Sequence, residues 1–150
     1  MKAFPDTSFL CSFYRRQEHT PRALAWMKSR HQPLLVSSLL IVEFKQLVRL
    51  QNFLFKNDRT RGFPEREGSA MIRDLQTDLA GGLLKLVAPD WAEVHRLAEE
   101  LSGKHTADEG HRLADLLHLA TAKYLGSEVF LSFDERQRTL AVAEGMTLAV

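Results

Sequence analysis

The stretch HRLADLLHLATAKYL, residues 111–125, decides the fold expected for this chain. Between Leu113 and Leu125 ionisable side chains are few, and apolar residues occur on every side of a helix with 3.6 residues per turn. A helix that is apolar nearly all round is typical of a buried position. Gly126 follows directly and is expected to end it. The sequence therefore predicts a buried helix over 111–125.

Asp115 is the residue in this helix that needs an explanation. An ionised carboxylate in apolar surroundings costs several kcal/mol unless a cation or hydrogen bonds compensate it. We therefore expect Asp115 to have a partner, and the rest of the chain offers three further carboxylates that could share a metal ion with it.

Length and composition limit the classes of protein that fit. With 150 residues, 45% of them hydrophobic, the chain can form one domain with a full core over residues 1–150. A net charge of +1 argues against a strongly basic nucleic-acid-coating protein and against an acidic tail, but not against a local basic patch. The single cysteine, Cys11, argues against a disulfide framework or a thiolate zinc cluster and fits a reducing cytoplasm. No apolar run reaches the roughly 20 residues of a membrane span, so we expect a cytoplasmic protein without a membrane partner.

Strand and helix signals alternate along the rest of the chain. We predict strands at 2–5, 33–36, 83–88, 128–133 and 146–150, helices at 9–15, 20–28, 39–56, 67–80, 91–101, 111–125 and 135–144, and loops at 57–66 and 102–110. Thr7 or Ser8 is the expected N-cap of the first helix. This order predicts an α/β fold, a three-layer α/β/α sandwich with a central, mostly parallel sheet of about five strands.

Four carboxylates fall at the same edge of such a sheet. Asp6 and Asp134 directly follow strands, Glu43 lies roughly 7 Å into its helix, and Asp115 lies in the first turns of its own. Crossover helices begin at the carboxyl edge of a parallel sheet, where open α/β folds bind their ligands. Each acid alone could be a helix cap or a solvated side chain. Together they predict a shared site.

Crowded carboxylates repel one another unless cations are bound. Oxygen ligands of this kind suit Mg²⁺ or Mn²⁺. Such ions can activate water for attack on a phosphodiester and stabilise the leaving oxygen. The sequence therefore favours a metal-dependent hydrolase.

Four short blocks of the chain resemble the signature blocks of PIN-domain ribonucleases, and most closely those of the VapC-type toxins of toxin–antitoxin pairs. The blocks are Phe4–Ser8, Ser37–Glu43, Leu113–Ala122 and Leu131–Asp134. Their order and spacing span nearly the whole chain. The resemblance implies a PIN-like fold, Mg²⁺ or Mn²⁺ as cofactor, and endonucleolytic cleavage of single-stranded RNA that leaves a 5′-phosphate.

The resemblance also assigns roles to residues. It implies that Asp6, Glu43, Asp115 and Asp134 are the catalytic, metal-binding acids and that Ser8 and Ser132 support them. One position departs from the family pattern. Many members carry a further Asp three residues after the fourth acid, where this chain has Gln137, so the sequence leaves open whether one or two metal ions bind.

A toxin of this class implies an RNA substrate, a cognate antitoxin protein and self-association as a homodimer. Candidates for contacting RNA phosphates are basic residues, namely Lys56, Arg59, Arg61, Arg66 and Arg112. The end of helix 39–56 is more apolar than one buried face requires, which predicts either core or a dimer or antitoxin interface; the residues are Leu47, Leu50, Phe53, Leu54 and Phe55.

Three alternatives compete with this interpretation. His111, Asp115 and His118 share one helix face and could bind a transition metal, although a buried histidine is more often hydrogen-bonded core. A receiver that binds Mg²⁺ is disfavoured because the paired acids after the first strand and the lysine after the last strand are missing. A phosphatase that binds Mg²⁺ is disfavoured because Ser8 stands where it needs a second Asp. A catalytically silent PIN-fold binding or regulatory module is disfavoured because all four acids are present.

Overall fold

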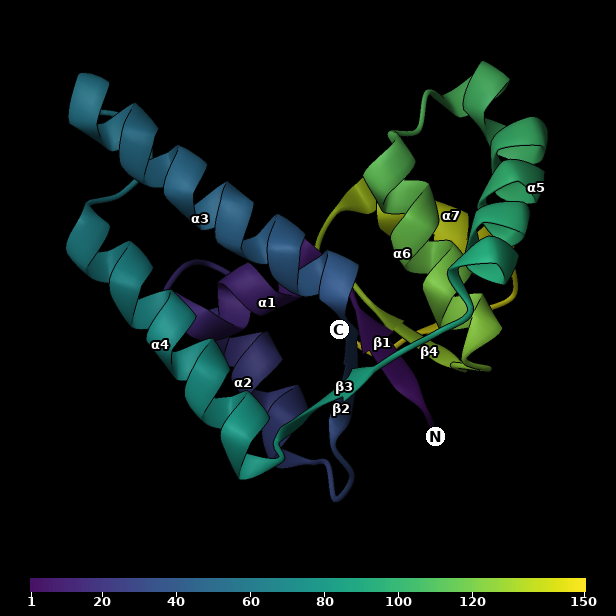
Figure 1. The fold of residues 1–150 in the computed structure, drawn as a ribbon, viewed down its shortest axis with the longest axis horizontal. Helices are drawn as coiled ribbons and strands as arrows, with labels where there is room; N and C mark the ends of the chain where they lie inside the picture. Colours follow the sequence, from purple (N-terminus) through teal and green to yellow (C-terminus); the bar gives the residue numbers. More distant parts are fainter.

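The computed structural model describes residues 1–150 and contains twelve elements (Figure 1). The strands are β1 (Ala3–Pro5), β2 (Leu34–Ser37), β3 (Leu84–Val87), β4 (Val129–Leu131) and β5 (Thr147–Leu148). The helices are α1 (Thr7–Tyr14), α2 (Thr20–Lys28), α3 (Ser38–Asn57), α4 (Glu65–Gly81), α5 (Trp91–Glu109), α6 (Leu113–Tyr124) and α7 (Glu135–Ala143). None of these helices is both long and apolar enough to cross a membrane.

The strands pair in parallel, as predicted, but their hydrogen bonds form two sheets, of three and two strands, rather than one. β1 pairs with β4 and β4 with β5, while β2 pairs with β3, and β1 lies beside β2. The strands therefore follow the order β3-β2-β1-β4-β5. Going along the chain from β1, the next two strands are added on one side and the last two on the other.

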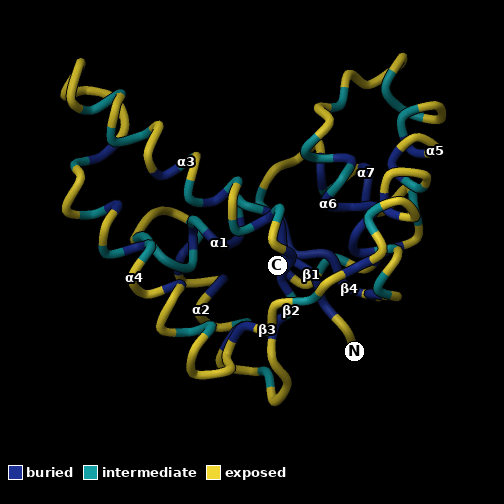
Figure 2. Tube along the Cα trace, viewed as in Figure 1, coloured by how far each residue is buried: buried dark blue, intermediate teal, exposed yellow.

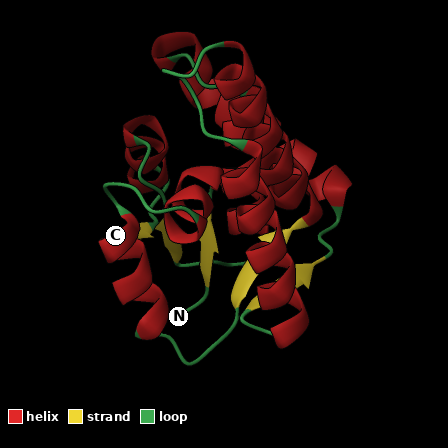
Figure 3. Cartoon of the chain, turned by 90° about the vertical axis from the view of Figure 1, so that its left-hand side faces the viewer, coloured by secondary structure: helices red, strands yellow, loops and turns green.

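This strand order places the helices in two layers. Right-handed crossovers put the connections β1–β2 and β2–β3 on one face, and the connections β3–β4 and β4–β5, which run the opposite way, on the other. Figure 1 shows α1–α4 on one side of the strands and α5–α7 on the other, and Figure 3 shows the strands at the centre with helices over them. The predicted three-layer α/β/α arrangement is confirmed.

The core lies along the two central strands. Every residue of β1 and β4 is buried, and Phe4 and Phe130 are completely covered. Figure 2 shows this buried centre in dark blue, with exposure increasing along the outer parts of the helices. Short strands buried on both sides read as continuous apolar runs, which is why the sequence signals them clearly.

Two stretches differ from the prediction. The polar residues 102–110 are not a loop, because α5 continues to Glu109 and ends at Gly110 with a positive φ of 72°. The helix predicted over 111–125 begins only at Leu113, and Leu113 is 68% exposed. α5 packs on α6, and its polar residues after Leu101 remain helical, with His105 among them bonded to Glu144 (2.7 Å). Composition alone therefore misplaced this boundary.

α3 and α4 form a long antiparallel hairpin that projects from the sheet (Figure 1). Gly68 allows the two helices to approach, since a Cβ there would lie 2.5 Å from the Asn52 side chain and 2.9 Å from Val48. The amide of Asn52 donates to the carbonyl oxygens of Phe63 and Pro64 and ties the turn to α3. The hairpin is therefore a packed arm rather than an open loop.

Candidate functional site

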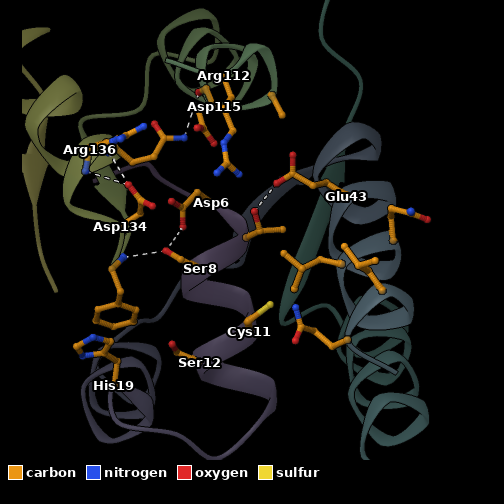
Figure 4. Close-up of a pocket in the computed structure, with 18 of the residues that line it drawn as sticks. Asp6, Ser8, Cys11, Ser12, His19, Glu43, Arg112, Asp115, Asp134 and Arg136 are labelled. Atoms are coloured by element: carbon orange, nitrogen blue, oxygen red, sulfur yellow. Dashed lines mark hydrogen bonds between the residues drawn. The ribbon is translucent and has the colours of Figure 1, made fainter. Parts of the chain in front are cut away.

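A groove opens at the carboxyl ends of β1 and β4. These are the two strands between which the strand order reverses, the position where open α/β sheets bind ligands. Its volume is about 870 Å³, and its walls come from α1, α3 and the starts of α6 and α7 (Figure 4). Asp6, Glu43, Asp115 and Asp134 all line this groove, as the sequence predicted.

Asp6 lies at the bottom of the groove, directly after β1. It is 3% exposed and accepts hydrogen bonds from the Ser8 hydroxyl (2.6 Å), the Ser132 hydroxyl and the Phe9 N–H (3.1 Å). The N-cap of α1 is therefore Asp6 and not Thr7 or Ser8, because the shorter Ser8 side chain turns back onto the carboxylate. Burial raises the pKa of Asp6 to about 6, although the hydrogen bonds from Ser132 and Ser8 act in the opposite direction.

Asp134 faces Asp6 from the end of β4. Its Oδ1 accepts from the N–H groups of Arg136 (2.9 Å) and Gln137 (3.1 Å), so it caps α7 as predicted. The Ser132 hydroxyl oxygen accepts from the Asp134 N–H (3.0 Å) while donating to Asp6. Ser132 thus links the carboxylate of Asp6 to the backbone of Asp134, and it lies beside the acids.

Glu43 approaches from α3 on the opposite wall. Its carboxylate accepts from the Thr7 hydroxyl and lies 3.1 Å from Nε2 of His118, outside the geometry of a regular hydrogen bond. Burial raises the pKa of Glu43, but His118, Thr7 and the charge of Arg112 outweigh burial and hold that pKa below its ordinary value. Glu43 is therefore ionised at neutral pH.

Asp115 completes the set from the first turn of α6. It is half-buried, and its pKa is raised by burial and then by the negative charges of Asp134 and Glu43. The direction of this shift is the one expected for acids that repel one another across the groove. The raised pKa means that an ionised Asp115 is unfavourable in this groove unless a cation compensates its charge.

The donor set fits a hard divalent cation, although the side chains do not form a finished coordination sphere. No three histidine, cysteine or carboxylate side chains are close enough to hold an ion as they stand. Four carboxylates from four elements nevertheless face one groove, and repulsion between them raises the pKa of Asp115. A cation with oxygen preference, such as Mg²⁺ or Mn²⁺, would relieve that repulsion.

The competing histidine site is not assembled. His111 lies on another cavity, between α5 and α6, and its Nε2 is 2.6 Å from Oε2 of Glu109. His118 is completely buried beside Glu43, and its Nδ1 has no hydrogen-bond partner. His111 therefore lines a different cavity from Asp115.

The predicted RNA-contacting residues fall into two places. Arg112 points into the groove near Asp115 and Glu43 (Figure 4), and its charge lowers the pKa of both. The other four are exposed around the tip of the α3–α4 arm and line no part of the groove; they are Lys56, Arg59, Arg61 and Arg66.

Gln137 occupies the position of the missing fifth acid. It is 1% exposed and donates from Nε2 to the backbone oxygen of Asp115 (3.2 Å). A neutral amide there joins α7 to α6 but adds no charge to the groove.

Sequence reasoning missed several residues of the groove. Gln17, His19, Phe133 and Arg136 line it. Phe133 belongs to a predicted strand, but no pattern in the sequence marked any of the four as a residue of the site. Cys11 also lies there, but burial, together with the charges of Asp6 and Glu43, raises the pKa of its thiol to about 12. The thiol is therefore protonated and unreactive at neutral pH.

The fold and the groove define a class: a parallel α/β sheet with acidic residues gathered at its switch point. The PIN domain family model matches residues 3–143 of the chain. The chain therefore belongs to the PIN domain family.

Solved structures show the same fold. VapC20 of Mycobacterium tuberculosis, described as a sarcin-ricin loop cleaving toxin, has a TM-score of 0.65 at 18% identity, with 97% of each chain covered. FitAcB of Neisseria gonorrhoeae has a TM-score of 0.63 at 17% identity over 97% of this chain and 95% of that one. VapBC-1 of nontypeable Haemophilus influenzae has a TM-score of 0.61 at 10% identity, covering 99% and 96%. No curated protein matches the chain.

Proposed function

We propose that this protein is a metal-dependent endoribonuclease that cuts single-stranded RNA and acts as the toxin of a type II toxin–antitoxin pair. The observation that carries the proposal is the groove at the switch point, where Asp6, Glu43, Asp115 and Asp134 meet from four elements. The PIN family membership and the fold shared with VapC20, which is described as a sarcin-ricin loop cleaving toxin, support it.

The four acids, the two serines Ser8 and Ser132, and Arg112 each have a defined task in this proposal. Asp6 and Asp134 would hold the cation from the strand ends, with Ser8 and Ser132 orienting Asp6 through their hydroxyl groups. Glu43 and Asp115 would complete the ligands from the helices, and Arg112 would bind a phosphate of the RNA. A bound Mg²⁺ or Mn²⁺ would supply activation of water and neutralisation of charge at the phosphodiester.

The same proposal covers the whole chain and its partners. The 29 buried apolar residues form one cluster, which supports a single catalytic domain over residues 1–150. The exposed apolar side chains of α3 would contact a second copy or an antitoxin protein. The lone cysteine suits a reducing cytoplasm.

The test is cleavage of single-stranded RNA by purified protein with and without chelator. Cleavage should stop in EDTA and return with added Mg²⁺ or Mn²⁺. Glu43→Gln should be nearly inactive, whereas His118→Gln should keep most of its activity at saturating Mg²⁺. Equal cleavage in chelator would contradict the metal mechanism, and a dead His118→Gln beside an active Glu43→Gln would move the site to the histidines.

A further inference from the structure

An aromatic stack forms part of the groove wall beside the acids. The rings of His19 and Phe133 lie parallel, with centroids 4.5 Å apart and an angle of 8° between their planes. Figure 4 shows His19 below Asp134, and Phe133 lines the same groove. The nuclease chemistry proposed above assigns neither of them a task.

The position of this stack is coupled to the position of the acids. Phe133 stands between Ser132 and Asp134 in the chain, and its N–H donates to the Ser8 hydroxyl at 2.9 Å. The same hydroxyl donates to Asp6 at 2.6 Å. Phe9 stacks on Phe133 as well, with centroids 6.0 Å apart. The ring of Phe133 is thus held at a set distance from the candidate reacting centre.

His19 is placed by its backbone rather than by its side chain. The hydroxyl of the next residue, Thr20, donates to the Ser12 oxygen at 2.7 Å and accepts from the Gln17 N–H at 2.8 Å. The His19 ring makes no hydrogen bond within the chain, does not cap α2, and remains partly exposed in the groove. Neither capping nor hydrogen bonding requires an aromatic ring at this position.

We propose that His19, supported by Phe133, is the platform on which an unpaired nucleobase stacks next to the phosphodiester that is cut. The inference rests on the proposed nuclease function and deepens it by defining the substrate. Bases stack on aromatic side chains in single-strand recognition, and only an unpaired base can turn out of its helix to do so.

Neighbouring groups fit the same nucleotide. The guanidinium of Arg22 lies 5.4 Å from the centre of the Phe133 ring and can hold an adjacent phosphate. The exposed Gln17 side chain lies on the groove and can form hydrogen bonds with a base edge. The substrate class is therefore RNA with at least one splayed, unpaired base beside the cut.

The test uses a single-stranded oligoribonucleotide that carries 2-aminopurine, whose fluorescence falls on stacking. Binding is measured with Ca²⁺ in place of Mg²⁺, and a gel confirms that the RNA stays intact. The wild type should quench the probe. His19→Ala should lose the quench and bind about tenfold more weakly or worse, while His19→Phe should retain both. His31→Ala, at an exposed histidine outside the groove, is the matched control and should behave as the wild type.

Cleavage in Mg²⁺ separates this inference from the nuclease proposal. His19→Ala should raise KM and leave kcat near the wild-type value, as should an abasic nucleotide in the substrate. A His19→Ala protein that quenches and cleaves as the wild type overturns the platform and leaves the nuclease intact. A wild type that quenches but cuts no RNA overturns the nuclease and leaves the platform. If His19→Ala does not fold, His19→Leu replaces it, and quenching by the Leu variant equal to that of the Phe variant overturns the platform.

Discussion

The side chain of Asp6 has two roles. It caps α1, and it also faces the other acids of the groove. Its folded pKa of about 6 lies above the ordinary value of 3.8, so ionisation of Asp6 destabilises the fold. That destabilisation sets in as the pH rises from 3.8 to about 6 and is complete at neutral pH. A bound cation would remove it by pairing with the carboxylate.

Replacement of Asp6 by Asn tests this balance. At neutral pH without metal, Asp6→Asn should match the wild type or exceed its unfolding free energy by about 1–2 kcal/mol, because the buried charge is gone. Thermal melts should show that Mg²⁺ stabilises the wild type and not the variant. Asp108→Asn, an exposed acid outside the groove, is the control and should keep the Mg²⁺ response. A large loss of stability in metal-free Asp6→Asn would make Asp6 a purely structural cap.

At the level of elements, Glu144 joins three helices. It lies just after α7 and accepts from Lys123 of α6 and from Nε2 of His105 of α5 (2.7 Å). Burial raises the pKa of Glu144, but these contacts outweigh it and hold that pKa at about 2. His105 belongs to the extension of α5 that the sequence pattern missed, and Glu144 raises its pKa.

The stabilisation by Glu144 should therefore depend on pH. Its folded pKa lies below the ordinary value of 4.5, so the contribution is present above pH 4.5 and disappears as the pH falls towards 2. Urea melts should show Glu144→Gln less stable than the wild type by about 1–2 kcal/mol at neutral pH. The difference should shrink steadily in acid. Glu99→Gln, an exposed acid on α5 without an ion pair, should show no such difference.

The packing of α3 on α4 can be tested with two glycines that differ in their surroundings. Gly68→Ala should destabilise the protein by about 1–3 kcal/mol, because its Cβ would collide with Asn52 and Val48. Gly103→Ala in α5 meets open space and should stabilise it by up to about 1 kcal/mol through helix propensity. Denaturant melts measure the unfolding free energy of both variants. If Gly68→Ala leaves it unchanged, the two helices can move apart freely.

For the whole molecule, the exposed face of α3 is the candidate contact surface. Leu50 is 47% and Phe53 is 60% exposed, although both are apolar. We expect the wild type to sediment as a dimer and the double variant Leu50→Glu, Phe53→Glu to sediment as a folded monomer. Val142→Glu on α7, at a residue 56% exposed, is the matched control and should remain dimeric. A wild type that stays monomeric at high concentration would exclude self-association through this face.

Local patterns in the sequence were enough to predict most of the elements and the edge of the sheet at which the strands end. The apolar strand around Phe130 and the apolar helix around Asp115 can be recognised from local sequence. Parallel crossovers then bring the carboxyl ends of all strands to one edge of the sheet. This is why Asp6, Glu43, Asp115 and Asp134 could be predicted as one group from their positions in the chain. Periodicity and the alternation of strands and helices sufficed because these features depend on neighbouring residues.

Only the tertiary structure decided which side chains meet within that edge. Asp6 is the N-cap of α1, and its carboxylate accepts hydrogen bonds from Ser8 and from Ser132, which is 126 positions away in the chain. α5 continues through a polar stretch in which His105 bonds Glu144, 39 positions away in the chain. The ring of His19 stacks on Phe133, and the turn that carries His19 has no hydrophobic periodicity in the sequence. Such contacts join residues far apart in the chain, and their geometry depends on how the helices pack rather than on any local preference.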